Sequence, residues 1–341
     1  MTVKQALLAR LEESKGQFVS GRLLSEALHC SRAAVSKAAA WLKQDGYDIE
    51  SVPNKGYRLS EKSDILSAEA LRPLLDHPDV SITIRETLPS TNRLLSQLAM
   101  EDALPSGSFV IAEEQTGGRG HLGHSFYSPK ACGLYLSVLL RLSAQDSKAK
   151  SRLETLTCRA AVAACRAIAS LYGVSLEIKW VNDLYARIDG AYRKIGGILT
   201  EAHTDFETGR CDFAVVGLGL NLTTPEGGYP EEIADLAGNL SQLLPARTSQ
   251  LSCSRIAAAF VNELLKAYED DSAMVQYKEL SLLPGKNVLL LDPFAPSEAP
   301  RKAEVLGITD EGRLRIRMED GNEETLSFGD VSLALPSAET A

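Results

Sequence analysis

The sequence predicts a multidomain α+β protein with a helical N-terminal module, a mixed α/β centre and an all-β C-terminal end. Apolar residues recur at helical spacing between residues 3 and 46, and long amphipathic segments alternate with strand-like runs in the centre. Short alternating strands separated by turns follow residue 286. A chain of 341 residues has room for two or three domains. We place them at residues 1–62, 63–281 and 282–341.

The N-terminal module is expected to contain three helices and a hairpin. Apolar side chains at helical spacing predict a first helix over residues 3–14. Ser20 and Ser31 are suitable N-caps for two further helices, and Gly46 ends the third as a C′ glycine. Residues 48–59 read as two short strands around a Pro-Asn-Lys-Gly turn. Three short helices followed by a hairpin are typical of a winged helix-turn-helix.

The third helix and the hairpin form a candidate DNA-binding surface, because the third helix of this motif enters the major groove. Residues 1–62 contain ten Lys and Arg against seven Asp and Glu, whereas the remainder contains 26 against 38. A mildly basic module therefore precedes an acidic body. The alternative is a small helical interaction module with an ordinary solvated face. The residues expected to contact DNA are Arg32, Ser36, Lys37, Lys55 and Arg58.

The other elements alternate between helix and strand up to residue 281. Helices are expected at residues 92–100, 153–172 and 255–270, and strands at 108–114, 133–141, 176–180, 194–203 and 212–221. Turn-rich connections predict antiparallel pairing of the last three strands. Beyond residue 286, strands at 287–292, 303–308, 313–318 and 324–328 predict a small barrel.

Composition excludes several classes of protein. Hydrophobic residues make up 44% of the chain and charged residues 24%, as in soluble globular proteins, and the net charge of −9 argues against nucleic-acid binding by the whole molecule. No apolar run approaches the roughly 20 residues of a membrane span, and the charged N-terminus is not a signal peptide. Six cysteines without a C-x-x-C pair favour free thiols. We expect a cytoplasmic protein with no membrane partner and no metal held by its own side chains.

Residues 115–126, QTGGRGHLGHSF, place four glycines within seven residues. Such a loop lets the backbone approach a bound anion closely. Residues 118–123 fit the dinucleotide pattern G-x-G-x-x-G, but Pro129 and Gly133 interrupt the segment where the required helix should follow. His124 occupies the position of the P-loop lysine. Neither nucleotide motif applies, and the loop alone is equally compatible with a flexible connection between strands.

Several motifs occur together and in a fixed order. After Ser90-Thr91-Asn92 and the glycine loop come KWVND at 179–183, KIGGIL at 194–199 and GLGLN at 217–221. With the N-terminal winged helix-turn-helix, this combination resembles the bifunctional biotin–protein ligases that are also biotin operon repressors. The resemblance covers nearly the whole chain. It implies a central biotin/lipoyl-ligase-like catalytic domain and a C-terminal SH3-like β-barrel.

The resemblance implies a reaction in two steps. The carboxylate of biotin attacks the α-phosphate of ATP, giving biotinyl-5′-AMP and pyrophosphate, and a lysine of biotin carboxyl carrier protein then takes the acyl group. ATP and biotin are the substrates, and Mg²⁺ would neutralise the triphosphate. Charge developing at phosphorus needs converging cations and N–H donors, which Arg119 and the amides of residues 117–123 would supply. The resemblance also implies a homodimer, promoted by biotinyl-AMP as corepressor, that binds operator DNA.

The resemblance also assigns roles to individual residues. Those implied to bind biotin are Ser90, Thr91, Asn92, Gln115, Gly118, Arg119, Gly120, His121 and Lys194. Those implied to bind the nucleotide are Arg119, Asn182 and Asn221. The catalytic set is Arg119, Lys194, Asp183 and Lys179, in which Asp183 would orient or deprotonate the acceptor lysine and Lys179 would contact a phosphate.

The sequence departs from the family pattern at three positions. The family loop often carries arginine where this chain has His121 and His124, and often has proline at Val181. Histidine is charged only below about pH 6.5, so the loop would hold an acyl-phosphate less firmly. Two alternatives are a lipoate-type ligase and a biotin-sensing repressor with impaired ligase activity. The ureido-binding residues and the barrel argue against the first, and the retained Arg119 and Lys194 argue against the second.

Overall fold

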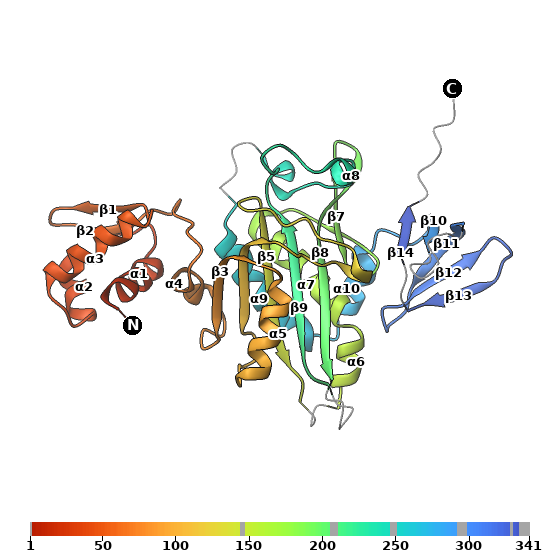
Figure 1. The fold of residues 1–341 in the computed structure, drawn as a ribbon, viewed down its shortest axis with the longest axis horizontal. Helices are drawn as coiled ribbons and strands as arrows, with labels where there is room; N and C mark the ends of the chain where they lie inside the picture. The colour runs from red at the N-terminus through yellow and green to blue at the C-terminus, as the bar shows by residue number, and fades with distance from the viewer. Residues whose placement is uncertain are drawn as a thin grey trace.

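The computed structural model describes residues 2–143, 147–204, 211–245, 251–291, 299–327 and 330–333. Figure 1 shows a helical N-terminal unit, a central sheet covered by helices and a C-terminal sheet arranged in a row. The central sheet lies between the two smaller units. This arrangement confirms the expected α+β class with a helix-turn-helix at the N-terminus. The exact domain boundaries stay a prediction.

The N-terminal unit has the three expected helices and the hairpin. The elements are α1 (Val3–Glu13), α2 (Gly21–Ala27), α3 (Arg32–Gln44), β1 (Ile49–Val52) and β2 (Gly56–Leu59). The hydroxyls of Ser20 and Ser31 accept hydrogen bonds from the third residue of α2 and α3, as their capping role requires. Gly46 follows α3 with φ of +93°, a conformation that glycine adopts without strain. Local sequence signals therefore determine both ends of the recognition helix.

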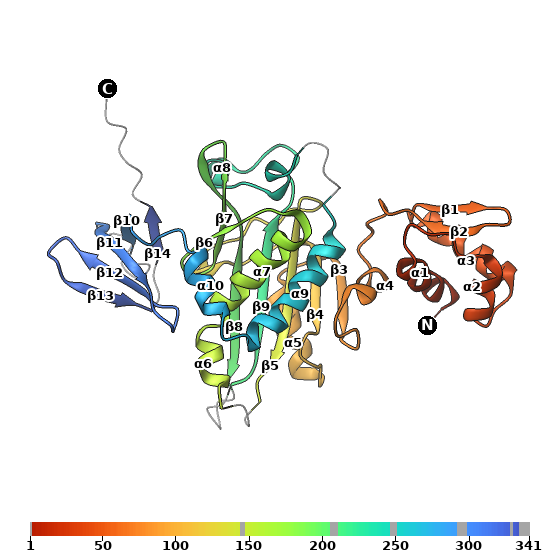
Figure 2. The ribbon, with the colours of Figure 1, turned by 180° about the vertical axis from the view of Figure 1, so that it is seen from behind.

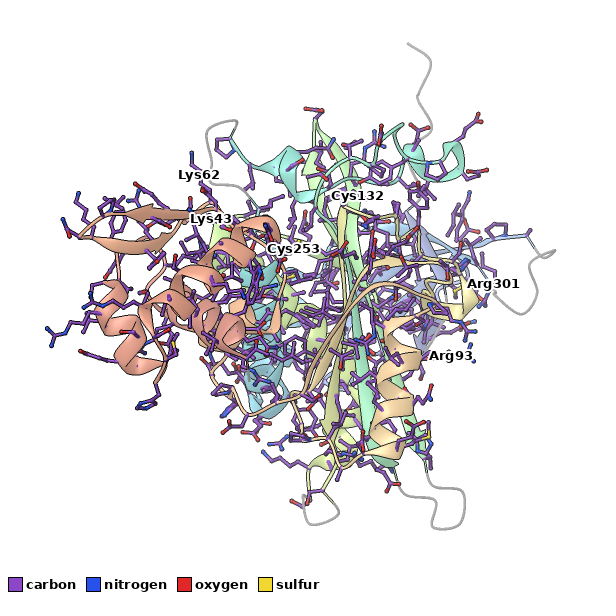
Figure 3. All side chains as sticks on the ribbon, turned by 60° about the vertical axis from the view of Figure 1, so that its left-hand side comes forward. Lys43, Lys62, Arg93, Cys132, Cys253 and Arg301 are labelled. Atoms are coloured by element: carbon purple, nitrogen blue, oxygen red, sulfur yellow. The ribbon has the colours of Figure 1, made fainter. Side chains whose placement is uncertain are left out.

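The linker after the hairpin is fastened to the central unit. The carboxylate of Asp64 accepts hydrogen bonds from Ser252 Oγ at 2.7 Å and from the amide of Cys253 at 2.8 Å. These two residues begin α9 (Cys253–Glu269), whose N-terminal end favours a negative charge. Figure 3 shows Cys253 where the N-terminal unit meets the centre. The linker therefore fixes the N-terminal unit to the central unit at the start of α9.

A seven-stranded sheet forms the central unit, in the order β3-β4-β5-β9-β8-β7-β6. Only β3 and β4 pair in parallel, and the other neighbours are antiparallel. The strands are β3 (Ile82–Leu88), β4 (Phe109–Gln115), β5 (Gly133–Arg141), β6 (Glu177–Lys179), β7 (Asp183–Ile188), β8 (Ala191–Thr204) and β9 (Cys211–Asn221). The predicted antiparallel pairing is confirmed for β8 and β9. The expected strand at 176–180 does not pair with β8, because the unpredicted strand β7 lies between them.

Helices cover both faces of this sheet. Figure 2 shows α7 (Leu156–Tyr172), α9 and α10 (Ala273–Leu280) in front of one face, and Figure 1 shows α5 (Thr91–Glu101) against the other. The main hydrophobic core lies under α7 and α9, and a smaller cluster lies under α5. The remaining α-helices described in this unit are short: α4 (Ala68–Leu71), α6 (Ala149–Glu154) and α8 (Glu231–Ala234).

The C-terminal unit is a five-stranded antiparallel sheet in the order β13-β12-β11-β10-β14. Its strands are β10 (Asn287–Leu291), β11 (Arg301–Ile308), β12 (Leu314–Met318), β13 (Glu323–Leu326) and β14 (Asp330–Leu333). The indole Nε1 of Trp180 donates a 2.8 Å hydrogen bond to the carbonyl of Gly312, which joins this sheet to the central unit. Closure of the sheet into an SH3-like barrel stays a prediction.

Candidate active site

A pocket of about 360 Å³ lies at the end of the central sheet where β4 leads into the glycine loop. The predicted residues that line it are Ser90, Thr91, Asn92, Gln115, Arg119, Gly120, His121, Lys179, Asn182, Asp183, Lys194 and Asn221. They come from segments up to 131 residues apart in the chain, between Ser90 and Asn221. Gly118 instead lines an adjoining groove. The fold thus brings the predicted ligase residues, apart from Gly118, into one cavity.

The glycine loop folds back on itself at the mouth of the pocket. The amide of Phe126 donates to the carbonyl of Gly118 at 3.0 Å, and the amide of Gly120 donates to the backbone carbonyl of His124 at 2.7 Å. The short 3₁₀ turn His121–Gly123 lies at its tip, with Gly123 at φ of +83°. A Cβ at Gly118 would lie 2.5 Å from the carbonyl oxygen of Phe126, so the base of the loop requires glycine.

Part of the expectation for this loop is wrong. The amide of Gly117 donates to the carbonyl of Pro89 at 3.0 Å, and the amide of Gly120 is taken by His124. Neither can serve as an anion donor in this conformation, because each N–H has one strong acceptor. Two of the glycines therefore serve close packing of the loop. Arg119 is exposed and faces the pocket from the same loop.

Polar side chains at the start of α5 form one end of the pocket. Thr91 and Asn92 are only 4% exposed. The oxygen of the Gln115 carboxamide accepts from the Thr91 amide at 2.8 Å, and its Nε2 donates to Ser128 Oγ at 3.2 Å. Ser90 occupies the N-cap position of α5 without a side-chain capping hydrogen bond. This end of the cavity therefore offers fixed neutral donors and acceptors, which suit a small polar, uncharged ring.

A half-buried ion pair lies further along the pocket. Lys194 Nζ is 2.7 Å from Asp183 Oδ1, and the two side chains are 34% and 18% exposed. Asp183 begins β7 and Lys194 lies in β8, and these two strands are neighbours in the sheet. A Cβ at Gly197 would lie 3.3 Å from Asp183 Oδ1, so glycine leaves space beside this pair. The arrangement places one cation and one carboxylate at a single point of the cavity.

The two predicted nucleotide asparagines both hold backbone in place. Asn182 Nδ2 donates to the carbonyl of Ile198 at 2.9 Å, and Asn221 Nδ2 donates to the carbonyl of Gly238 at 2.9 Å. Lys179 lies opposite Asp183 in the β6–β7 hairpin, with its ammonium 5.9 Å from the centre of the Tyr185 ring. All three residues line the pocket. Their contact with a nucleotide stays a prediction.

The predicted DNA-binding residues lie together on the N-terminal unit. Arg32, Ser36 and Lys37 are exposed along α3. On the wing, the Lys55 ammonium and the Arg58 guanidinium lie 5.8 and 4.7 Å from the centre of the Phe18 ring. Arg58 also forms an ion pair with Glu50, and the Lys37 ammonium is 4.8 Å from the Trp41 ring. The surface combines cations with one exposed ring, Trp41, and one half-buried ring, Phe18.

Three segments match known families. Residues 3–58 match the HTH domain, 84–221 the biotin/lipoate A/B protein ligase family and 299–334 the biotin protein ligase C terminal domain. The bifunctional ligase/repressor BirA of Bacillus spizizenii is 34% identical over 243 residues, which cover 71% of each chain. The chain belongs to the biotin/lipoate A/B protein ligase family. The resemblance expected from the motifs is thus confirmed.

Two further similar proteins support this family assignment. BirA of Escherichia coli is 35% identical over 65% of this chain and 64% of its own. The biotin protein ligase of Aquifex aeolicus, solved in complex with biotin and ATP, superposes with a TM-score of 0.58 over 74% of this chain and 98% of that chain. Because the two sequences are only 23% identical, this superposition establishes a shared fold and nothing more. No helix within the described ranges is long and apolar enough to cross a membrane.

Sequence reasoning gave no role to some residues that line the pocket of this ligase. The ring of Phe126 packs so closely on Gly219 that a Cβ there would lie 2.5 Å from it. Tyr229 donates its hydroxyl to the carbonyl of Gly238 at 3.2 Å, and Leu236 is 58% exposed at the rim. Phe126 is the last residue of the glycine loop, and that position was the available signal. Tyr229 and Leu236 lie in an irregular segment without periodicity.

Proposed function

We propose that this protein is an ATP-dependent biotin–protein ligase that also represses transcription of biotin genes. It would form biotinyl-5′-AMP and transfer biotin to a lysine of biotin carboxyl carrier protein, with biotinyl-AMP as corepressor. The observation that supports this best is one cavity with a neutral polar end around Thr91 and a Lys194–Asp183 pair further along. Biotin has the matching form, a neutral ureido ring joined by a chain to a carboxylate.

In the first step, the pocket would bring two anions together. Lys194 and Arg119 would bind the biotin carboxylate and the α-phosphate and stabilise the charge that develops at phosphorus. Asp183 is the only carboxylate among the described residues that line the cavity, and no group of three metal-binding side chains occurs in the described ranges. These residues do not form a metal site of their own. Mg²⁺ would therefore enter on the triphosphate as part of the ATP substrate.

In the second step, an acceptor lysine would attack the acyl carbon of biotinyl-AMP. A lysine must lose a proton to become a nucleophile, and Asp183 is the group in the pocket that can take it or orient the amine. The Lys194 ammonium lies 2.7 Å from this carboxylate and would fix its position beside the acyl group. AMP would then leave as the amide bond forms.

Repression would depend on two copies of the N-terminal module. One module with three more basic than acidic residues makes few phosphate contacts, whereas a dimer on a palindromic operator doubles them. The two hydrogen bonds from the start of α9 to Asp64 would orient each N-terminal module relative to its ligase unit. Sedimentation with and without biotin and ATP tests this scheme. An unchanged mass together with unchanged operator affinity would contradict the repressor function.

The ligase function is tested by incubating the protein with Mg²⁺, ATP and either biotin or lipoate and measuring pyrophosphate. We expect release with biotin and little with lipoate, because the neutral polar end requires a ring with donors and acceptors. Release with lipoate alone would favour a lipoate-type ligase. Absence of release with tight biotin binding would favour a sensing repressor with impaired catalysis.

A further inference from the structure

A chain of hydrogen bonds runs from the protein surface to the polar end of the pocket. Asn92 Nδ2 donates to Glu201 Oε2 at 2.7 Å and to the carbonyl of Leu199 at 3.2 Å. Ser137 Oγ lies 2.6 Å from Asn92 Oδ1 and 2.7 Å from Thr91 Oγ1. Ser137 is fully buried in the middle of β5 and does not line the pocket. The chain thus connects Glu201 to Thr91 through two buried side chains.

The direction of each hydrogen bond follows from the chemistry of the groups. A carboxylate and a backbone carbonyl only accept, so both N–H groups of Asn92 point towards them and its oxygen faces Ser137. That oxygen also only accepts, so Ser137 must donate its single hydrogen to Asn92. The 2.7 Å contact between the two hydroxyls is then a donation from Thr91 to Ser137.

Thr91 consequently presents lone pairs to the ligand. Its one hydroxyl hydrogen is directed into the protein, and the alternative acceptor, Gln115 Oε1, is further away at 3.1 Å and already receives the Thr91 amide. A hydroxyl held in this way accepts hydrogen bonds and rejects a ligand oxygen placed in the same position. Space for the Asn92 amide comes from Gly217, where an added Cβ would overlap Asn92 Oδ1.

We propose that Ser137 and Glu201 are positioning residues that determine specificity by fixing Thr91 as an acceptor for a ligand N–H. This inference rests on the proposed function, in which the ligand is biotin and the N–H belongs to its ureido ring. Glu201 does not line the cavity, and its backbone lies at the exposed end of β8. Neither residue lines the cavity, so both act through Asn92 and Thr91.

The test compares Ser137→Ala, Glu201→Ala and Glu201→Gln with the wild type in pyrophosphate release. Ser137→Ala should raise the KM for biotin about two- to tenfold, the range for one neutral hydrogen bond, and leave kcat and the KM for ATP unchanged. Glu201→Ala should shift the KM for biotin in the same direction. Glu201→Gln should resemble the wild type, because an amide oxygen still accepts from Asn92.

The role of the Thr91 hydroxyl as an acceptor is tested separately, with a biotin analogue in which a ring oxygen replaces a ureido N–H. Wild type should prefer biotin over this analogue, and Ser137→Ala should narrow the preference because the Thr91 hydrogen becomes free to turn towards the ligand. An unchanged KM for biotin in Ser137→Ala, or an unchanged preference, overturns the inference. Failure of the wild type to release pyrophosphate with biotin would instead overturn the proposed ligase function, so the two failures are distinguishable.

Discussion

The pocket of the central unit and the DNA-facing surface of the N-terminal unit both collect polar residues, but they hold them differently. In the pocket, Thr91 and Asn92 are 4% exposed and bonded to protein groups on several sides. On α3, Arg32 and Lys37 are exposed, and Lys37 rests over Trp41. Protein partners fix the polar side chains of the pocket, whereas the surface cations are exposed to solvent.

This difference predicts how each region responds to substitution. A buried polar group that loses its partner costs the full desolvation of that group, whereas an exposed cation contributes modestly and is screened by salt. Single changes in the pocket should therefore have large effects on one substrate. Single changes on the surface should have small effects that depend on salt.

The largest effect is expected for Lys194→Ala. This change removes the cation that would bridge carboxylate and phosphate and leaves Asp183 unpaired, so adenylate formation should fall by about 10² or more. Pyrophosphate release measures it. Lys286→Ala is a matched control, since that ammonium lies over the Tyr192 ring outside the pocket lining. A folded Lys194→Ala protein with nearly normal release would overturn the assignment.

The next largest effect is expected for Gly217→Ala. The added Cβ would displace the Asn92 carboxamide, and we expect biotin affinity to fall by about tenfold or more by calorimetry. Gly21→Ala is the control, because a Cβ there would meet nothing closer than the Tyr57 ring at 3.5 Å, in the N-terminal unit. Equal biotin affinity in both variants would show that the Asn92 position is adaptable and would weaken the contrast between the two regions.

A smaller effect is expected for Lys37→Ala on the DNA-facing surface. Loss of one phosphate contact per module should weaken operator binding severalfold and lower the slope of log K against log salt by about one for each module. Titrations of labelled operator at several salt concentrations measure this. Lys302→Ala, an exposed cation on β11, should change neither quantity. A loss of affinity that does not depend on salt would point to base readout by Lys37.

The smallest effect on stability is expected for substitution of Glu12, whose carboxylate is buried although most charged side chains of the N-terminal unit are exposed. Burial raises its pKa above 4.5, despite the Lys15 ammonium at 3.0 Å, and its Oε1 has no hydrogen-bond partner among the residues that the structure describes. Because the folded protein holds this proton more tightly, the contribution to stability is present below about pH 4.5 and is lost as pH rises through the raised pKa.

Glu12→Gln should remove this dependence, with a difference below about 1 kcal/mol after solvent screening. Thermal unfolding of both proteins between pH 4 and 7 measures it. Parallel stability curves would show that Glu12 is solvated in the folded protein.

Much of the fold could be predicted because its signals are local. Ser20 and Ser31 each bond an amide three residues away, and Gly46 takes the left-handed conformation that ends α3. Such interactions need only neighbouring residues, so the sequence determines them. Strands β3 and β7 were not predicted. In β3, Glu86 breaks the alternation of Ile82, Ile84 and Leu88. In β7, Leu184, Ala186 and Ile188 do alternate with other residues, so the signal was present in this short strand and was not used.

The candidate site was predicted through motifs, but the tertiary structure decided how its residues work. Asn92 and Glu201 lie 109 positions apart and meet only because the sheet order places β8 under the start of α5. The same packing gives the amides of Gly117 and Gly120 to protein carbonyls, against the prediction from glycine content. A motif determines which chemical groups are available. Which partner each group bonds depends on strand register across the whole domain, because hydrogen bonds require atoms within about 3 Å of each other.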